Sequence, residues 1–465
     1  MSRQPDNAAL KEMASTAAAA SASHPPMSRP RILFVSGFFP PYSPLGAVRA
    51  PELAAHWQSN GHDVRVIAVK DPAIEGMLDL PLAPDQVTYV PYAPDTTLMQ
   101  RLTGSRGRSS ELATAGTAPA TPAKTPKPGQ RDRLRWLRQF YRQAEQFPDR
   151  HWSWIDPAVD AGRRLGADWR PDLVYSSAPP HSGHIVAQRI AEHLNLPWVA
   201  ELRDPWAINA HDDVHPLIKP WRKRIALNTL AHATACVAVS ATLASFTRTI
   251  VSCPTIVSYN GFGADDFPEG NTPAPFDPER LTLIHAGAIY AERRDPTPLF
   301  RALATMGEDH DKVRVQFFHD QRDWVQDKAR EFGVEACLEM CQPVPRKQIL
   351  ARQREVDVLL MCRWDDPGGD GIIPGKLFEY IGARRPILSI GSTTGEAADV
   401  IRDGDFGLVA NDTDVIANQL RAWLEQKCAN GGRLPDMPAA PTTAFLRDTQ
   451  FEQIDALIAQ VLARA

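Results

Sequence analysis

A lysine and a glutamate stand three residues apart in the segment GIIPGKLFEYIGARRPIL, residues 371–388. Pro374 and Gly375 precede them, and proline is favoured at the first positions of a helix. The unpaired N–H groups at such a helix start attract anions. Lys376 is unfavourable in that first turn unless a bound phosphate neutralises it, and Glu379 could then accept hydrogen bonds from a ribose diol. A solvated Lys376–Glu379 pair is the alternative, and the spacing alone does not decide between the two.

A rigid, proline-rich loop, GFFPPYSPLGAVR, occupies residues 37–49 and reaches Gly46 at the expected start of a helix. In an open α/β sheet such a loop faces the ligand cleft, because ligands bind outside the carboxyl ends of the strands. The loop lacks the GxGxxG pattern, which argues against a dinucleotide cofactor. A stiff connector is the other interpretation of the loop, and Arg49 is either a cation of the cleft or a surface charge.

Polar residues also follow two later strand-like runs. SSAPPHSGH (176–184) brings His181 and His184 after one run, and ELRDPW (201–206) brings Arg203 and Asp204 after the next. A single histidine is usually structural. Two histidines and an Arg-Asp pair after neighbouring strands predict a polar cluster at the ligand-binding edge of the sheet.

A basic loop, HAGAIYAERRDP, spans residues 285–296. Gly287 would let the backbone approach a ligand closely. Arg293 and Arg294 can each contact a phosphate through two N–H groups. A solvated basic loop is the alternative for at least one of the two arginines.

The elements that must position these residues alternate along the chain between short apolar runs and amphipathic stretches. This alternation predicts parallel sheets built from βαβ units. The expected strands are 31–38, 63–69, 172–177, 197–202, 235–240, 255–260, 281–287, 313–318, 356–361 and 386–390. The expected helices include 46–60, which stops at Gly61, and 182–195, 218–232, 376–384 and 449–465.

The fold predicted from this pattern is α/β, with two doubly wound Rossmann-like domains joined by a polar linker. A chain of 465 residues is too long for a single core. In the last expected helix, Phe451, Ile454, Leu457 and Val461 fall on one face. The predicted division is a disordered tail over 1–29, a first domain over 30–262 with a disordered insertion at 101–130, a linker at 263–279, a second domain over 280–440, and a helix over 441–465 that packs back on the first domain.

Composition narrows the class of protein. The chain is 43% hydrophobic with a net charge of −4, and no apolar run reaches the roughly 18 residues that span a bilayer. The first residues lack the pattern of a secretory signal, and the chain could equally start at Met27. The six cysteines show no CxxC spacing, so we expect a reduced, cytoplasmic protein without a zinc site or a disulfide framework.

One segment differs in charge from the rest. Residues 101–142 contain ten Arg or Lys against Glu111 and Asp132, whereas the whole chain is negative. Within it, RLRWLRQFYRQ (133–143) interleaves aromatic and basic residues, which is typical of a helix at an anionic membrane surface. The alternative is that these aromatic residues pack on the first domain. No nucleic-acid partner is predicted.

Taken together, residues 30–465 resemble the retaining nucleotide-sugar glycosyltransferases of the GT-B fold, family 4-like. RILFVSGFFPPYSPLGAVR resembles the first strand and glycine loop of that family, and SYNGFGADDF (258–267) resembles the segment that leads into its interdomain linker. GAIYAERRDPTPLFRAL is similar to its diphosphate-binding loop. PGKLFEYIGARRPIL is similar to the segment that bears the second glutamate of its E-x7-E motif. Gly371 stands where that motif has its first glutamate, with Asp370 one residue out of register.

The resemblance implies two domains facing each other across a cleft and transfer of a sugar, with retention, from a nucleotide diphosphate donor. The acceptor would be a glycan or a lipid-linked molecule of bacterial surface polysaccharide synthesis, with the enzyme at the inner face of the plasma membrane. Neither a metal nor a cofactor is expected, because cationic side chains can stabilise the departing diphosphate. The implied catalytic group is His181, Arg203 and Asp204, and the implied donor-binding group is Gly46, Gly287, Arg293, Arg294, Lys376, Glu379 and Tyr380.

Two other functions remain open on the same residues. A nucleotide-sugar 2-epimerase would share the diphosphate contacts but would need acid/base carboxylates and no sugar acceptor. A catalytically degenerate assembly partner would bind the donor without turnover, which is consistent with Gly371 in place of the first motif glutamate.

Overall fold

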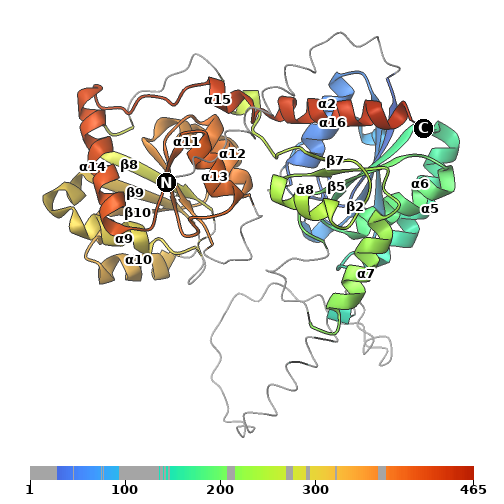
Figure 1. The fold of residues 1–465 in the computed structure, drawn as a ribbon, viewed down its shortest axis with the longest axis horizontal. Helices are drawn as coiled ribbons and strands as arrows, with labels where there is room; N and C mark the ends of the chain where they lie inside the picture. The colour runs from blue at the N-terminus through green and yellow to red at the C-terminus, as the bar shows by residue number, and fades with distance from the viewer. Residues whose placement is uncertain are drawn as a thin grey trace, which may run out of the picture. The chain divides into compact units, whose positions relative to one another are not determined.

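The structure is a computed structural model (Figure 1). It divides into two compact units. The N-terminal unit comprises residues 29–238, 246–255 and 460–465, and the C-terminal unit comprises residues 239–245 and 256–459. Within these, the structure describes residues 29–44, 47–74, 76, 78–93, 136, 140, 143–144, 147–206, 215–268, 276–287, 289, 294–319, 322–364 and 373–464.

The first sheet has seven strands in the order β3-β2-β1-β4-β5-β6-β7. Its neighbouring strands from β3 to β6 pair in parallel. The strands are β1 (Arg31–Ser36), β2 (Asp63–Lys70), β3 (Val87–Pro91), β4 (Leu173–Ala178), β5 (Trp198–Leu202), β6 (Ala235–Ala238) and β7 (Thr255–Val257). The helices of this part of the chain are α2 (Arg49–Ser59), α5 (Ile155–Trp169), α6 (Ser182–Leu194), α7 (Lys219–Leu230) and α8 (Ala241–Arg248).

The second sheet has six parallel strands in the order β10-β9-β8-β11-β12-β13. The strands are β8 (Leu281–Ala286), β9 (Val313–Phe318), β10 (Leu338–Cys341), β11 (Val358–Cys362), β12 (Ile387–Ile390) and β13 (Gly407–Val409). The helices are α9 (Thr297–Thr305), α10 (Arg322–Glu331), α11 (Arg346–Glu355), α12 (Gly375–Gly382), α13 (Glu396–Asp403), α14 (Thr413–Ala429), α15 (Ala440–Thr443) and α16 (Arg447–Leu462).

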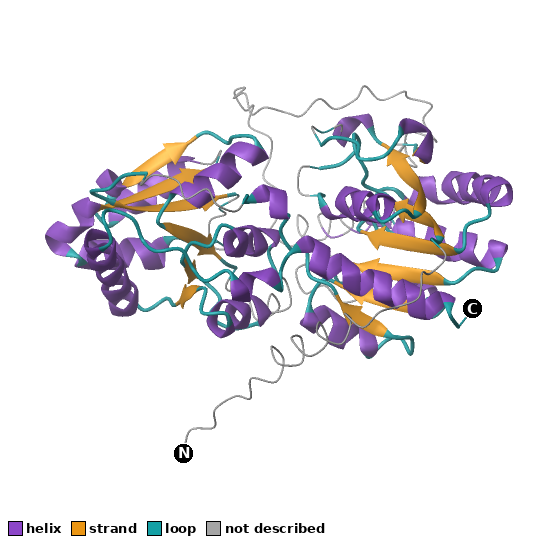
Figure 2. Cartoon of the chain, turned by 90° about the horizontal axis from the view of Figure 1, so that it is seen from above, coloured by secondary structure: helices purple, strands orange, loops and turns teal. Residues whose placement is uncertain are grey.

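Each sheet lies between helices, as Figure 2 shows. The central strands β1, β4, β5, β8, β11 and β12 are accordingly almost entirely buried, as a covered parallel sheet requires. The edge strands β7, β10 and β13 are only partly buried. In the N-terminal unit, Phe34 of β1 packs edge-on against Trp57 of α2 and Tyr175 of β4, with ring centroids 5.5 and 5.6 Å away. The chain leaves α2 at Gly61, which has a φ of 82°, a conformation that glycine adopts without strain.

Both sheets reverse their winding direction next to their first strand. The reversal lies between β1 and β4 in the first sheet and between β8 and β11 in the second. In open α/β sheets ligands bind at this switch point, outside the carboxyl ends of the strands. The strand order therefore directs attention to the segments after β1, β4, β8 and β11.

The predicted α/β class with two doubly wound sheets is confirmed, and every expected strand and helix is present to within a few residues. Strands β3, β10 and β13 were not predicted, because they are short edge strands of three to five residues. The four apolar residues expected on one face of the last helix are all buried. None of the helices among the described residues combines the length and apolar character needed to cross a bilayer.

Candidate functional site

The lysine after Pro374 lies at the switch point of the second sheet. Pro374 is the N-cap residue of α12, and Lys376 in the first turn extends to the end of β8. Its Nζ donates a hydrogen bond of 2.8 Å to the main-chain oxygen of Ala286. The next residue, Gly287, has a φ of 125°, and a Cβ there would come within 2.5 Å of Lys376 Nζ. Glycine at position 287 is therefore what allows the ammonium to lie against this turn.

This ammonium lies in an electropositive and poorly hydrated place. Part of the Lys376 chain is accessible to solvent. Its ammonium, however, is surrounded by protein atoms, and this desolvation, together with the charge of Arg294, lowers the pKa of Lys376 to about 8. A bound anion would reverse the effect, because an opposite charge favours the protonated lysine. The ammonium is therefore largely desolvated, and its role in binding an anion stays a prediction.

Two fully buried side chains, Tyr380 of α12 and His285 of β8, contact the same main-chain oxygen in the middle of β11. The Tyr380 hydroxyl donates to the main-chain oxygen of Leu360 at 3.2 Å, and His285 Nδ1 lies 3.0 Å from the same oxygen. Burial, with the charge of Lys376, keeps the pKa of His285 far below its usual value, so the imidazole is neutral. Its Nε2 is buried without a hydrogen-bond partner. Tyr380, predicted as a donor-binding residue, is thus held by the protein itself and positions the helix.

The glutamate predicted to hold a ribose is clamped by an arginine that the sequence analysis did not identify. Arg346 at the start of α11 donates to both carboxylate oxygens of Asp266, at 2.7 and 2.9 Å. The same guanidinium lies 3.3 Å from Glu379 Oε1. Burial raises the pKa of Glu379, although Arg346 opposes this shift. Glu379 is therefore oriented through one oxygen, which leaves Oε2 as an acceptor at the edge of α12.

In the N-terminal unit, the two predicted histidines lie with a tryptophan just beyond β4 and β5. The His181 ring stacks on Trp206 with centroids 5.2 Å apart and planes 9° from parallel. The His184 ring centroid is 5.7 Å from that of Trp206. Burial keeps both imidazoles neutral: the pKa of His184 falls to about 3, and that of His181 is well below its usual value.

The hydrogen bonds around Ser176 indicate which nitrogen of His184 carries the proton. The Trp198 indole donates to Ser176 Oγ at 2.8 Å, and the same Oγ lies 2.8 Å from His184 Nδ1. If the buried hydroxyl proton is to be paired, Ser176 must donate to Nδ1, and His184 then carries its proton on Nε2. That Nε2, His181 Nδ1 and Trp206 Nε1 are all buried without a hydrogen-bond partner. Unpaired buried groups of this kind are costly, so the cluster can bind the polar atoms of a ligand.

Arg203 and Asp204 follow β5 directly. The guanidinium of Arg203 donates to the main-chain oxygens of Ala178 and Pro179, at 3.4 and 2.9 Å, which joins the end of β5 to the end of β4. Burial lowers the pKa of Arg203, although the charges of Glu201 and Asp204 partly offset the effect. Arg203 therefore organises the polar cluster through the main chain.

Arg49 is neither a cleft cation nor a surface charge, the two alternatives that the sequence left open. It is buried in α2 and forms an ion pair of 2.9 Å with Glu201, which is fully buried in β5. Glu201 also accepts hydrogen bonds from Tyr175 at 3.0 Å and from Ser177 at 2.5 Å. Burial disfavours the carboxylate, but Arg49 and these bonds outweigh it, and the pKa of Glu201 is lowered.

Several predicted residues lie outside the described part of the chain. These are Gly46, Arg293 and the motif positions Asp370 and Gly371, so their roles stay predictions. Arg294 is described and acts on Lys376 through its charge. Among the described residues, no group of three His, Cys, Asp or Glu side chains is arranged to hold a metal ion. The six cysteines are free thiols.

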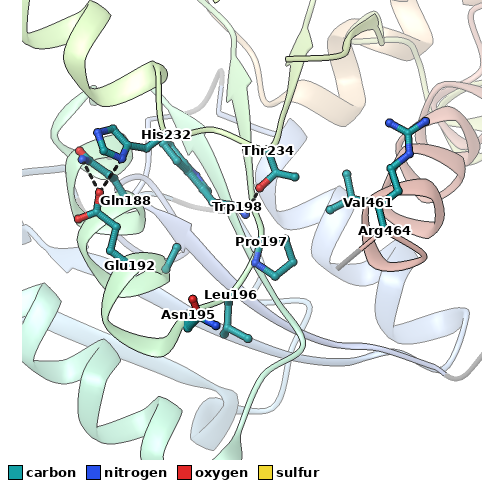
Figure 3. Close-up of a pocket in the computed structure, with 11 residues that line it drawn as sticks. Gln188, Glu192, Asn195, Leu196, Pro197, Trp198, His232, Thr234, Val461 and Arg464 are labelled. Atoms are coloured by element: carbon teal, nitrogen blue, oxygen red, sulfur yellow. Dashed lines mark hydrogen bonds and ion pairs between the residues drawn. The ribbon is translucent and has the colours of Figure 1, made fainter. Parts of the chain in front are cut away.

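A surface pocket of about 400 Å³ lies elsewhere in the N-terminal unit, at the amino end of β5 (Figure 3). Three of its polar side chains already pair with one another. Glu192 Oε1 accepts from Gln188 at 3.0 Å and lies 2.8 Å from His232 Nδ1. Because ligands of open α/β sheets bind at the opposite, carboxyl end of the strands, we assign the candidate site to the two polar groups described above and not to this pocket.

Comparison with known proteins supports the fold assignment. No protein-family model matches the sequence, and no curated protein matches it. Solved structures do match. HepE from Anabaena in complex with UDP is 14% identical, with 92% of this chain and 100% of that chain covered and a TM-score of 0.57. Sucrose-phosphate synthase from Thermosynechococcus elongatus is 12% identical, with 94% and 100% covered and a TM-score of 0.58.

A third match is a Listeria monocytogenes protein named as a UDP-N-acetylglucosamine 2-epimerase. It is 13% identical, with 94% of this chain and 98% of that chain covered and a TM-score of 0.50. At such low identities the matches establish the fold. The chain has the fold of the GT-B glycosyltransferases.

Proposed function

We propose that this protein is a glycosyltransferase that takes a sugar from a nucleotide diphosphate donor. The observation that carries the proposal is the Lys376 ammonium, which lies against the Gly287 turn at the switch point of the second sheet. A poorly hydrated cation at a helix N-terminus fits a diphosphate, since the helix N–H groups and the lysine both favour negative charge there. The fold is shared with HepE, which was solved with UDP.

In this proposal the C-terminal unit binds the nucleotide. Lys376, Arg294 and the N–H groups of α12 stabilise the charge that develops on the diphosphate as the glycosidic bond breaks. Glu379, oriented by Arg346, accepts hydrogen bonds from the ribose diol. No metal or other cofactor is assigned to this step, and activity that is unchanged by a chelator would support that assignment.

The N-terminal unit binds carbohydrate in the same proposal. Hydroxyl groups of a sugar can accept hydrogen bonds from His184 Nε2–H and Trp206 Nε1–H, which are both buried and unpaired. His181 and Asp204 orient the sugar or the acceptor, and Arg203 holds the ends of β4 and β5 in place. We further propose transfer with retention to a glycan or lipid-linked acceptor of surface polysaccharide synthesis, at the inner face of the plasma membrane.

The test has two stages. A panel of nucleotide sugars is first screened by thermal shift, because a ligand that binds only the native state raises its melting temperature. The donor that gives the largest shift is then incubated with candidate acceptors, and the anomeric configuration of the product is read by NMR. A glycoside with the donor configuration supports the proposal, whereas donor binding without any transfer product argues for an assembly partner.

An epimerase is the second candidate, because a protein named as a 2-epimerase shares the fold. Incubation with donor alone separates the two activities. Formation of the 2-epimer without an acceptor would show that the protein is an epimerase and not a transferase.

A further inference from the structure

Helix α7 carries the most exposed large apolar side chain among the described residues. Trp221 in its first turn is 68% exposed, and Leu217 just before the helix is 53% exposed. The two residues are four positions apart, one in the turn before the helix and one in its first turn. In Figure 1 the start of α7 extends away from the other helices of the N-terminal unit. Exposed tryptophan and leucine on a protruding helix indicate a binding surface.

The charged residues from Leu217 to the end of α7 are all basic, whereas Asp212 and Asp213 precede this stretch in the sequence. Between His215 and Leu230 the sequence contains Lys219, Arg222, Lys223 and Arg224 and no acidic residue. Lys219, Lys223 and Arg224 are exposed. The protein as a whole has a net charge of −4, so this concentration of positive charge is local and not a consequence of the overall composition.

A second aromatic residue from a distant part of the sequence adjoins the same place. Trp136 is 44% exposed, and its ring centroid lies 4.2 Å from that of His215, which precedes α7. The main-chain N–H of His215 donates to Gln143 Oε1 at 2.6 Å. Trp136 of the segment RLRWLRQFYRQ thus lies against His215, two residues before Leu217 in the sequence, and is close to the start of α7.

We propose that this surface, made by Trp136, Leu217, Lys219, Trp221, Lys223 and Arg224, binds the surface of a bilayer that contains anionic lipids. Tryptophan is favoured at the level of the lipid headgroups, where its ring is partly apolar and its N–H remains hydrated. Lysine and arginine beside it contact lipid phosphates. A helix with this arrangement rests on the membrane and does not cross it. The inference does not depend on the sugar-transfer activity, because lipid binding requires neither donor nor acceptor.

A protein partner is the competing occupant of the surface. Interfaces between proteins are depleted in lysine at their centre, whereas this surface contains two exposed lysines and an arginine next to the apolar residues. This composition favours an anionic lipid surface over a second copy of the chain.

The test is sedimentation of the full-length protein with vesicles of phosphatidylcholine, with and without phosphatidylglycerol. We expect binding only to the phosphatidylglycerol-containing vesicles, weakened by salt. Leu217→Ala/Trp221→Ala removes the apolar side chains, and Lys223→Glu/Arg224→Glu reverses two charges. We expect the charge-reversed variant to bind at least about 25-fold more weakly, because each cation at an anionic membrane contributes about fivefold.

Matched controls lie in the same unit. Trp152→Ala removes a tryptophan that is 39% exposed, and Arg163→Glu/Arg164→Glu makes the same charge change on exposed residues of α5. Both controls should bind as the unaltered protein does. Circular dichroism confirms that each variant is folded.

Equal sedimentation of all variants, or no sedimentation of the unaltered protein, would overturn the proposal. So would a fall from dimer to monomer in the Leu217→Ala/Trp221→Ala variant, measured by sedimentation velocity without lipid, because the occupant would then be a second copy of the chain. Deletion of residues 101–130 separates this surface from the basic segment upstream. If the deletion variant no longer binds the vesicles while both α7 variants still do, residues 101–130 and not the α7 surface bind the membrane.

Discussion

Two charged sites, one in each unit, differ in how the charge is satisfied. In the N-terminal unit, Arg49 and Glu201 neutralise each other inside the protein, and Tyr175 and Ser177 complete the hydrogen bonds of the carboxylate. In the C-terminal unit, the Lys376 ammonium bonds to a main-chain oxygen, and the charge of Arg294 disfavours its protonated form further. Arg49 and Glu201 form a satisfied ion pair, whereas Lys376 is a cation whose environment improves when an anion binds.

This difference distinguishes a charge that is needed for folding from a charge that can bind a ligand. A buried pair that is fully hydrogen-bonded stabilises the fold only in comparison with a broken pair. A lowered pKa means that the protonated form of the cation is destabilised by its surroundings. A bound anion stabilises that protonated form. We therefore expect mutations at Glu201 to affect folding and mutations at Lys376 to affect ligand binding.

The largest effect is expected at the buried ion pair. Glu201→Gln removes the negative charge and leaves Arg49 buried without it, which should lower the free energy of unfolding by about 3–5 kcal/mol. Urea denaturation followed by tryptophan fluorescence measures the change. Glu192→Gln is the control, since Glu192 forms a half-exposed pair with His232, and its loss should cost less than about 1 kcal/mol. Equal losses in the two variants would mean that burial of the Arg49–Glu201 pair has no energetic consequence.

For Lys376→Met we expect weaker ligand binding without a loss of stability. The loss of a charge-assisted contact should weaken UDP binding by about 1.5–3 kcal/mol. The free energy of unfolding should stay the same or rise, because a poorly hydrated ammonium is removed. Calorimetric titration and urea denaturation give the two values. Lys347→Met, an exposed lysine of α11, is the control and should change neither value. Unchanged UDP affinity in Lys376→Met would mean that Lys376 does not bind the diphosphate and would support the alternative of a solvated Lys376–Glu379 pair.

The sequence predicted the parts of this picture that depend on local pattern. Two parallel sheets, the placement of His181, His184 and Arg203 after strands, and that of Lys376 in the first turn of the helix after Pro374 all follow from hydrophobic periodicity and strand order. The pairing of Arg49 with Glu201, and of Arg346 with Asp266 and Glu379, could not be predicted. These partners are far apart in the sequence, and only the folded sheet brings them together.

A signal for one of these pairs was nevertheless present in the sequence. Glu201 lies inside the apolar run PWVAEL, and an ionised carboxylate within a buried strand requires a cationic partner. That argument identifies the need for a cation without identifying Arg49. Trp206 was also overlooked, although it ends the quoted segment ELRDPW.

A smaller effect is expected for Glu379→Ala. If Glu379 binds the ribose diol, UDP affinity should fall by about 1–2 kcal/mol while the affinity for inorganic diphosphate stays the same. Calorimetric titration with the two ligands gives the comparison. Arg346 keeps its two bonds to Asp266 in the variant, so the fold around α11 should be retained. Equal losses for both ligands would show that Glu379 acts through the structure and not through the ribose.

The smallest expected effect is the uptake of a fraction of a proton when UDP binds. It tests directly whether Lys376 contributes to UDP binding through its charge. With a pKa of about 8, Lys376 is about half protonated at pH 8 in the free protein. A bound diphosphate favours the ammonium and raises its pKa, so UDP binding at pH 8 should take up to about half a proton from the buffer. The uptake should diminish as the pH falls toward 6.5, where the lysine is already charged. Calorimetry of UDP binding in buffers of different ionisation enthalpy measures the number of protons that are taken up.

The control is the same experiment on Lys376→Met, which should give no proton uptake at pH 8. If the variant takes up as many protons as the unaltered protein, another group is titrating and the uptake does not originate at Lys376.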